Sequence, residues 1–169
     1  MIRFFLLFLL LQGLMFTAEL TRPVQQHLVI PFTEGIARTS AWLIQLFDDR
    51  VHTYGVVIQD LDTGFAVAIQ AGCNGVEAII VLVAAILAFP APWRHRLVGI
   101  AVGFLAVQAI NLLRIITLFY LGQWNRTAFE WGHLYIWQAL IMLDVLVMFL
   151  VWLRFLPPRS QPREASDAA

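Results

Sequence analysis

A thiol, a guanidinium and an imidazole are the side chains of this sequence best suited to covalent chemistry. Cys73 is the single cysteine, Arg114 lies inside a long apolar stretch, and His133 opens the next one. A thiol attacks a carbonyl as the thiolate, and apolar surroundings raise its pKa, so it needs a nearby cation or base. Arg114 could stabilise the thiolate or an oxyanion, and His133 could carry the proton. These residues therefore predict acyl transfer through a thioester on Cys73, released to water or to an amine or hydroxyl acceptor.

Each of these residues also has a structural interpretation. A lone cysteine in a helix is usually a small apolar filler, and a histidine at a helix end is more often an interfacial anchor. Arg114 requires more explanation, because an Arg at the centre of an apolar helix costs about 2.5–3.5 kcal/mol to insert. Its structural role would be an ion pair with Glu77, which is expected at a compatible depth. Asn111 lies three residues before Arg114, on the same face of the same helix.

The composition places these residues in a membrane protein. Of the 169 residues, 60% are hydrophobic and 13% are charged, whereas soluble domains are nearer half apolar and a quarter charged. The net charge is zero and no long basic stretch exists, so we expect no nucleic-acid partner. One cysteine excludes an internal disulfide and a dithiol redox cycle within the chain. No spacing of His, Cys and carboxylates matches a metal site and no Gly-rich phosphate loop is present, so we predict no metal and no cofactor.

Apolar stretches predict an all-α integral membrane protein with about four transmembrane helices. A hydrocarbon core is about 30 Å thick, and we expect spans at about 4–20, 73–90, 97–121 and 133–156 within a single domain over 1–156. The polar segment 157–169 is expected to be a disordered cytoplasmic tail. The first stretch could instead be a cleavable signal peptide, but no Ala-x-Ala site occurs near Glu19, which favours a retained helix.

The segment between the first two spans predicts two further elements. Residues 24–47 carry apolar side chains at roughly helical spacing, which indicates an amphipathic helix at the interface or packed over the bundle, with a break or kink at Pro31. Two β-prone runs, 56–58 and 65–69, flank a turn at 60–64 and predict a small β-hairpin.

The distribution of arginines predicts the orientation. Arg94 and Arg96 lie in one short loop and further arginines flank both termini, whereas the loop 122–132 carries only Arg126. The positive-inside rule then places both termini in the cytoplasm and the hairpin segment outside.

This topology brings the candidate site residues to one membrane face. Cys73, Arg114 and His133 should share the extracytoplasmic layer, although three separate regions of the chain supply them. Asp144 and Gln108 should instead lie near mid-membrane, where they could satisfy each other.

Three motifs resemble the exosortase/archaeosortase family. Ala71-Gly-Cys73-Asn-Gly75 before one span, Asn111-Leu-Leu-Arg114 in the next and His133 opening the last have the order and spacing of its Cys, Asn-x-x-Arg and His positions. The compact length and the outer hairpin are most similar to the small exosortase H type, although many members have Ser or Ala where Asn74 stands.

The resemblance implies a membrane-embedded cysteine protease or transpeptidase of the bacterial inner membrane, multi-pass, with its active site on the extracytoplasmic side. It implies Cys73 as the nucleophile, Arg114 as the stabiliser of the thiolate or transition state, and His133 as the acid and base. Asn111, Glu77 and Asn74 would support them. The implied partners, besides membrane lipid, are exported proteins with a C-terminal sorting tail: a short motif, a hydrophobic helix and a basic end. For the exosortase H type the motif is of the Ile-Pro-Thr-Leu-x-x-Trp-Gly kind.

The alternative is a non-enzymatic four-helix subunit of a membrane assembly that binds partner helices or lipid. In that case Arg114, Glu77 and Asp144 would pair between helices, and Cys73 would fill space. Access of a membrane-impermeant thiol reagent to Cys73 from outside would discriminate between the two hypotheses.

Overall fold

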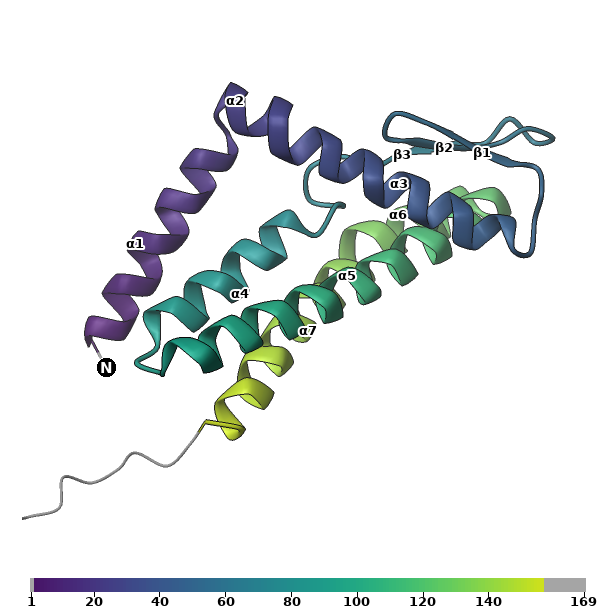
Figure 1. The fold of residues 1–169 in the computed structure, drawn as a ribbon. Helices are drawn as coiled ribbons and strands as arrows, with labels where there is room; N and C mark the ends of the chain where they lie inside the picture. Colours follow the sequence, from purple (N-terminus) through teal and green to yellow (C-terminus); the bar gives the residue numbers. More distant parts are fainter. Residues whose placement is uncertain (1, 157–169) are drawn as a thin grey trace, which may run out of the picture.

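The computed structural model describes residues 2–156, so the tail predicted at 157–169 lies outside the described residues. Most of the described chain is helical, and a small antiparallel sheet lies between α3 and α4. In chain order, with η for a π-helical turn, the elements are α1 (Ile2–Glu19), α2 (Arg22–Val24), η1 (Gln25–Val29), α3 (Ile30–Gln45), β1 (Val51–Tyr54), β2 (Val57–Asp60), β3 (Ala66–Ala68), α4 (Val76–Ala88), α5 (Trp93–Trp124), α6 (Arg126–Trp131), η2 (Gly132–Ile136) and α7 (Trp137–Arg154). Figure 1 shows the sheet at the end of the molecule opposite the N-terminus, beside α6.

Three helical segments among residues 2–156 are long and apolar enough to cross a membrane. They are α1, α5 and the continuous stretch Arg126–Arg154, which contains α6, η2 and α7. The span expected at 73–90 is a shorter apolar helix, because α4 has 13 residues and is about 20 Å long. Its start is set by Gly75, which has a positive φ of 78°, and Pro90 follows its end.

The loop expected at 122–132 is almost entirely helical. Only Asn125 separates α5 from α6, and its side-chain oxygen accepts a hydrogen bond from Ala128 N at 3.0 Å. This N-cap satisfies a backbone donor of the first turn of α6. The chain therefore turns back into the last helix without a long connection.

Helix α4 lies at the centre of the bundle and contacts α1, α5 and α7. Its apolar face packs against α5 and α7 in one cluster of buried side chains. Two glycines of α5 permit close approach: a Cβ at Gly103 would lie 2.4 Å from the Leu82 side chain, and one at Gly99 would lie 2.3 Å from Trp152. Small residues commonly allow membrane helices to approach in this way.

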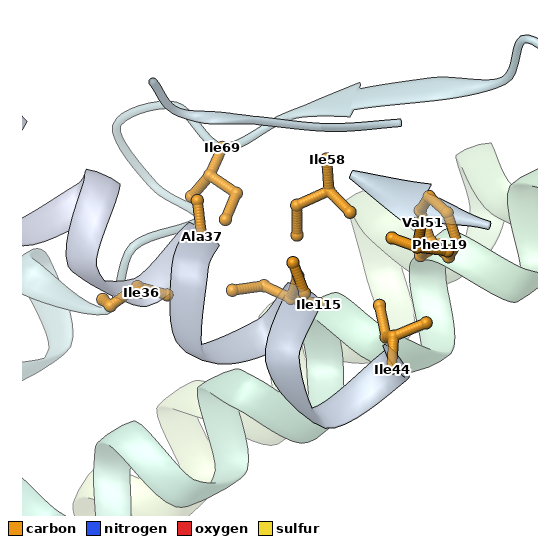
Figure 2. Close-up of a cluster of buried hydrophobic side chains, with 9 residues drawn as sticks. Ile36, Ala37, Ile44, Val51, Ile58, Ile69, Ile115 and Phe119 are labelled. Atoms are coloured by element: carbon orange, nitrogen blue, oxygen red, sulfur yellow. The ribbon is translucent and has the colours of Figure 1, made fainter. Parts of the chain in front are cut away.

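A second apolar core joins α3, the sheet and the C-terminal half of α5. Figure 2 shows it, and its buried members are Ile36, Ala37, Ala41, Ile44, Val51, Ile58, Ile69, Ile115 and Phe119. The amphipathic helix predicted within 24–47 therefore packs between the sheet and the bundle. Burial of apolar area of this kind is the main stabilising contribution that fixes the sheet over α5.

The break or kink expected at Pro31 is replaced by a different distortion. The chain stays helical from α2 to the end of α3, and η1 directly precedes the proline. Across this π-turn, Ile30 N donates to Gln25 O. Proline has no N–H to donate to the preceding turn, and the widened turn has already displaced the regular hydrogen-bond pattern at that point.

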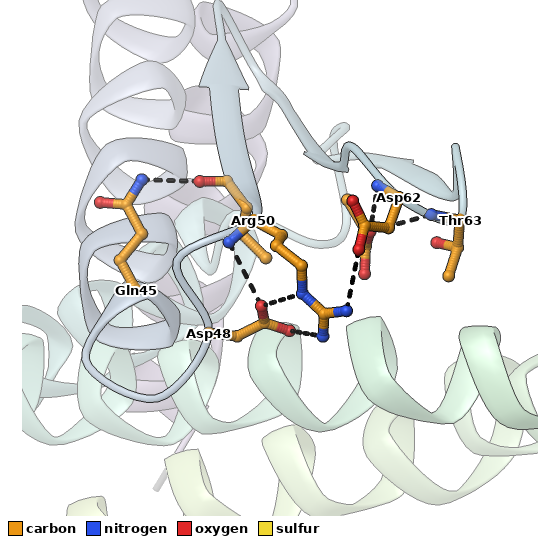
Figure 3. Close-up of polar contacts among 7 residues, drawn as sticks. Gln45, Asp48, Arg50, Asp62 and Thr63 are labelled. Atoms are coloured by element: carbon orange, nitrogen blue, oxygen red, sulfur yellow. Dashed lines mark hydrogen bonds and ion pairs between the residues drawn. The ribbon is translucent and has the colours of Figure 1, made fainter.

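The predicted hairpin is confirmed as β2 and β3, which pair antiparallel, with Ile58 opposite Val67. β1 was not predicted; it adds to β2 and gives the order β1-β2-β3. Figure 3 shows the polar contacts that hold the start of β1. Gln45 Nε2 donates to Val51 O at 2.6 Å, and Arg50 bonds Asp48 at 2.9 Å and Asp62 at 3.0 Å.

Candidate catalytic site

The three residues expected to carry the chemistry meet in space. The Sγ atom of Cys73 lies 3.0 Å from Nε2 of His133 and 3.6 Å from Nη2 of Arg114. Cys73 stands in the turn between β3 and α4, Arg114 in α5 and His133 in η2. A thiol, a cation and a base from three separate elements therefore share one site, at distances that permit proton transfer between the thiol and the imidazole.

The turn that carries Cys73 is fixed by Asn74. The Asn74 side chain is buried; its Oδ1 accepts from Val76 N at 3.0 Å, and its Nδ2 donates to Thr33 Oγ1 on α3 at 3.0 Å. The next residue, Gly75, has a positive φ, and a Cβ there would lie 2.7 Å from Gln108 Nε2. Both the backbone conformation and the space therefore favour glycine at this position.

Arg114 is buried and bonds the same turn. Its Nη1 donates to Gly72 O at 3.0 Å, while Nη2 faces the Cys73 sulfur. The expected ion pair with Glu77 was wrong: no ion pair between the two occurs within residues 2–156, and Glu77 instead accepts from Gly72 N. The peptide groups of Gly72 bond both side chains instead: its N–H donates to the Glu77 carboxylate, and its C=O accepts from the Arg114 guanidinium.

The polar residues deeper in the bundle also differ from expectation. Gln108 Nε2 donates to Asn74 O at 3.3 Å and makes no hydrogen bond to Asp144 in the part of the chain that the structure describes. Asn111 is fully buried one turn below Arg114, and its side-chain amide has no protein partner among residues 2–156. Gln108 therefore supports the Cys73 turn, and the contact expected between Gln108 and Asp144 was wrong.

Burial dominates the electrostatics of the thiol. Cys73 lies outside the membrane-spanning helices, and burial raises the pKa of its thiol, with Arg114 acting in the opposite direction and Glu77 adding to the increase. The resting thiol is therefore protonated, and its S–H can donate to an unprotonated Nε2 of His133. An adjacent base is what such a thiol needs in order to react.

The imidazole is held by Phe129 and by an irregular turn. The Phe129 ring stacks on His133 with centroids 5.7 Å apart and planes 15° from parallel. His133 belongs to η2, and π-turns inside helices occur frequently at functional sites. Phe129 was missed from the sequence, although its place four residues before His133 puts it on the same helix face.

A cavity of about 140 Å³ opens onto the site. Cys73, Arg114, His133 and Phe129 line it together with the segment that leads from β3 to the cysteine. Residues 67–70 of that segment carried no sequence signal for a binding role. Within residues 2–156, no group of three or more His, Cys, Asp or Glu side chains is placed to hold a metal ion.

The comparisons with known proteins concern nearly the whole chain. A family model described as transmembrane exosortase (Exosortase_EpsH) matches residues 1–153. Neither the curated proteins nor the solved structures give a match. The matched range contains Cys73, Arg114 and His133.

Proposed function

The chain belongs to the transmembrane exosortase family, and from this premise we propose that it is a membrane-embedded cysteine protease or transpeptidase. Its substrates are exported proteins that carry a C-terminal sorting tail. The observation that carries the proposal is the 3.0 Å contact between Cys73 Sγ and His133 Nε2, with Arg114 beside the sulfur. Cleavage by acyl transfer is the reaction for which a thiol, an adjacent base and a planar cation are suited.

The first half of the reaction forms a thioester. As Cys73 Sγ attacks the scissile carbonyl carbon, its proton passes to His133 Nε2 and the carbonyl oxygen becomes an oxyanion. Arg114 stabilises this negative charge with its fixed N–H donors. The intermediate collapses, the C–N bond breaks, and His133 returns the proton to the departing amine.

The second half releases the acyl group. Water, an amine or a hydroxyl acceptor attacks the thioester, and His133 accepts the proton of that nucleophile. The C–S bond then breaks, and the proton returns to the thiolate of Cys73. Water gives hydrolysis, whereas an amine or hydroxyl acceptor gives transpeptidation or another transfer.

We place the site at the extracytoplasmic face of a four-span protein in the bacterial inner membrane. The arginine distribution supports cytoplasmic termini. In this proposal α4 is the short fourth span, and the turn that carries Cys73 lies just beyond its N-terminal end.

The non-enzymatic alternative is less well supported by the contacts. It assigned Arg114 and Glu77 to interhelical pairing, yet within residues 2–156 each bonds Gly72 instead. It also gives no reason for the imidazole to contact the sulfur. The buried guanidinium therefore serves the Cys73 turn, which is the arrangement a catalytic role requires.

The test is processing of a reporter in membranes. An exported reporter protein would carry a C-terminal tail with the Ile-Pro-Thr-Leu-x-x-Trp-Gly motif, a hydrophobic helix and a basic end. We expect the wild-type chain to shorten it and Cys73→Ala to leave it intact, with the new C-terminus identified by mass spectrometry. His52→Ala, on the exposed surface of β1, is the matched control and should process normally. Processing by Cys73→Ala would end the acyl-enzyme proposal.

A further inference from the structure

Strand β3 has an edge that no other strand covers. It pairs only with β2 in the part of the chain that the structure describes. On either side of β3, Phe65 O accepts from Asp60 N and Ile69 N donates to Val56 O, both at 2.9 Å. Bonded and non-bonded pairs alternate along an antiparallel ladder, so the N–H and C=O groups of Ala66 and Ala68 point away from β2.

A cleft of about 450 Å³ runs along this free edge. β3 forms one wall, and the end of α5 and α6 form the other through Gly122, Phe129 and the Arg126–Glu130 ion pair. Ala66 and Ala68 are exposed and have short side chains. The peptide groups of the strand are therefore accessible from the cleft.

The cleft adjoins the cavity at the thiol. Val67, Ala68 and Phe129 line both of them, and the smaller cavity contains Cys73 and His133. The chain itself runs from β3 through the following turn to the cysteine. A ligand that extends along β3 past Ala68 therefore reaches the reacting sulfur.

The unpaired backbone groups on the free edge of β3 determine which kind of ligand can bind there. Unpaired N–H and C=O groups at strand spacing are satisfied by the backbone of another extended peptide, the arrangement known as strand addition. A lipid chain offers no such hydrogen bonds. The charged rim on α6 likewise suits a peptide segment outside the hydrocarbon layer more than an acyl chain.

We propose that the segment of the substrate around the cleavage site binds as a fourth strand on the free edge of β3, held by the backbone of Ala66 and Ala68. This inference rests on the proposed function and specifies how that site binds its substrate. Pairing with the outward-facing peptide groups would align the extended segment with the strand and deliver one of its carbonyl carbons to Cys73 Sγ. The register of the bound segment on β3 would then determine how the residues of the motif are positioned relative to Cys73.

The first test removes one backbone donor. Ala68→Pro deletes the outward N–H but leaves intact the hydrogen bonds of the residues that face β2, and proline is tolerated at such edge positions. We expect processing of the tail-bearing reporter to fall about tenfold, the loss associated with one backbone hydrogen bond. Thr53→Pro is the control, because the N–H of Thr53 points outward on the opposite edge of the sheet, although this variant also loses the hydrogen bond from Thr53 Oγ1 to Val57 O. It should process at the wild-type rate.

A second test measures binding without cleavage. In the Cys73→Ala background, a photoreactive p-benzoylphenylalanine in place of Arg126 should cross-link to the reporter tail, and one in place of Tyr54 on β1 should not. Adding Ala68→Pro should reduce the yield of the Arg126 cross-link about tenfold at subsaturating reporter. If the Ala68→Pro variant fails to accumulate in membranes, the Ala66→Pro variant is used in its place, because it removes the other outward N–H donor.

The outcomes separate this inference from the proposed function. Normal processing by both proline variants overturns strand addition and leaves the thiol mechanism in place. A proline-sensitive cross-link to a reporter that the wild-type chain never cleaves supports strand addition and overturns the proposed activity. A cross-link from Tyr54 but not from Arg126 places the substrate elsewhere and overturns the inference.

Discussion

The Sγ atom of Cys73 and the Nε2 atom of His133 are 3.0 Å apart, although 60 positions separate them in the chain. The contact joins the turn before α4 to η2, within the last helical stretch. It makes the imidazole the nearest base to a thiol whose pKa is raised by burial. The first prediction follows directly from this contact.

Replacing the imidazole should cost most of the activity. His133→Gln keeps a polar side chain but cannot accept and return a proton, and loss of a general acid and base typically lowers a rate by about 10²–10⁴-fold. We expect this decrease in reporter processing, measured by the rate of tail loss in membranes. His27→Ala, at an exposed histidine on η1, is the control. Equal rates for both variants would remove His133 from the mechanism.

Arg114→Lys should insert stably but process poorly. Arg114 uses two nitrogens, one on Gly72 O and one on the sulfur, and a single ammonium cannot reproduce this planar pair of donors. Loss of an oxyanion donor typically lowers a rate by about 10²–10³-fold. Unprocessed reporter should therefore accumulate beside a normal amount of the Lys variant on immunoblots. If Arg114→Lys processes the reporter at the wild-type rate, Arg114 contributes only its positive charge.

The reactivity of the thiol should increase with pH in a defined direction. Burial raises the pKa of Cys73, so the fraction of thiolate increases as the pH rises towards and through that raised value. Alkylation by the uncharged reagent iodoacetamide should therefore be slow at neutral pH and faster in alkaline buffer. Arg114→Gln removes the cation that lowers the pKa and should move the profile to higher pH. A profile that moves to lower pH in this variant would contradict the assigned electrostatics.

The tether between α3 and the Cys73 turn should contribute to stability. Thr33→Val removes the hydroxyl that accepts from buried Asn74 Nδ2, and an unsatisfied buried donor costs about 1–3 kcal/mol. The free energy of unfolding in detergent should fall by that amount. Thr39→Val is a matched control on the same helix, because its hydroxyl bonds only the backbone of its own helix and is exposed. A similar loss for the control would show that the tether makes no specific contribution.

The orientation can be tested with fusions. Reporters joined after Arg96 should give cytoplasmic signals, and reporters joined near Arg126 should give external ones, because the cationic loops remain inside. Paired alkaline phosphatase and green fluorescent protein fusions report the two compartments. A cytoplasmic signal near Arg126 would place His133 on the wrong side for an extracytoplasmic site.

Residue types and depths were sufficient to predict which side chains would meet. Cys73, Arg114 and His133 had each been expected in one membrane layer, and they are in contact. The expected depth of a residue does not say which way its side chain points, however. For this reason the predicted pairing of Arg114 with Glu77 was wrong. Whether the two charges face each other depends on the path of the backbone at Gly72, and two positive-φ glycines set that path.

The irregular parts of the fold had weaker sequence signals. β1 contains His52 and Thr53, and only one of its four residues is buried, so no apolar alternation marked it as a strand. Neither π-turn was predicted: η1 directly precedes the break or kink expected at Pro31, and η2 begins at the end of the loop expected at 122–132. Their positions depend on packing: one precedes Pro31, and the other contains His133, whose ring stacks on Phe129.

The order in which the site is assembled has a consequence during synthesis. The ribosome releases Cys73 60 residues before His133, an interval of about 3–12 s at 5–20 residues per second. Throughout that interval the thiol has no imidazole beside it, and Arg114 follows it only after most of α5 has been made. On the proposed mechanism, the nascent chain therefore passes through the insertion machinery with a cysteine that still lacks its base. If Cys73 is the nucleophile, translation order alone delays catalysis until the last helix is in place.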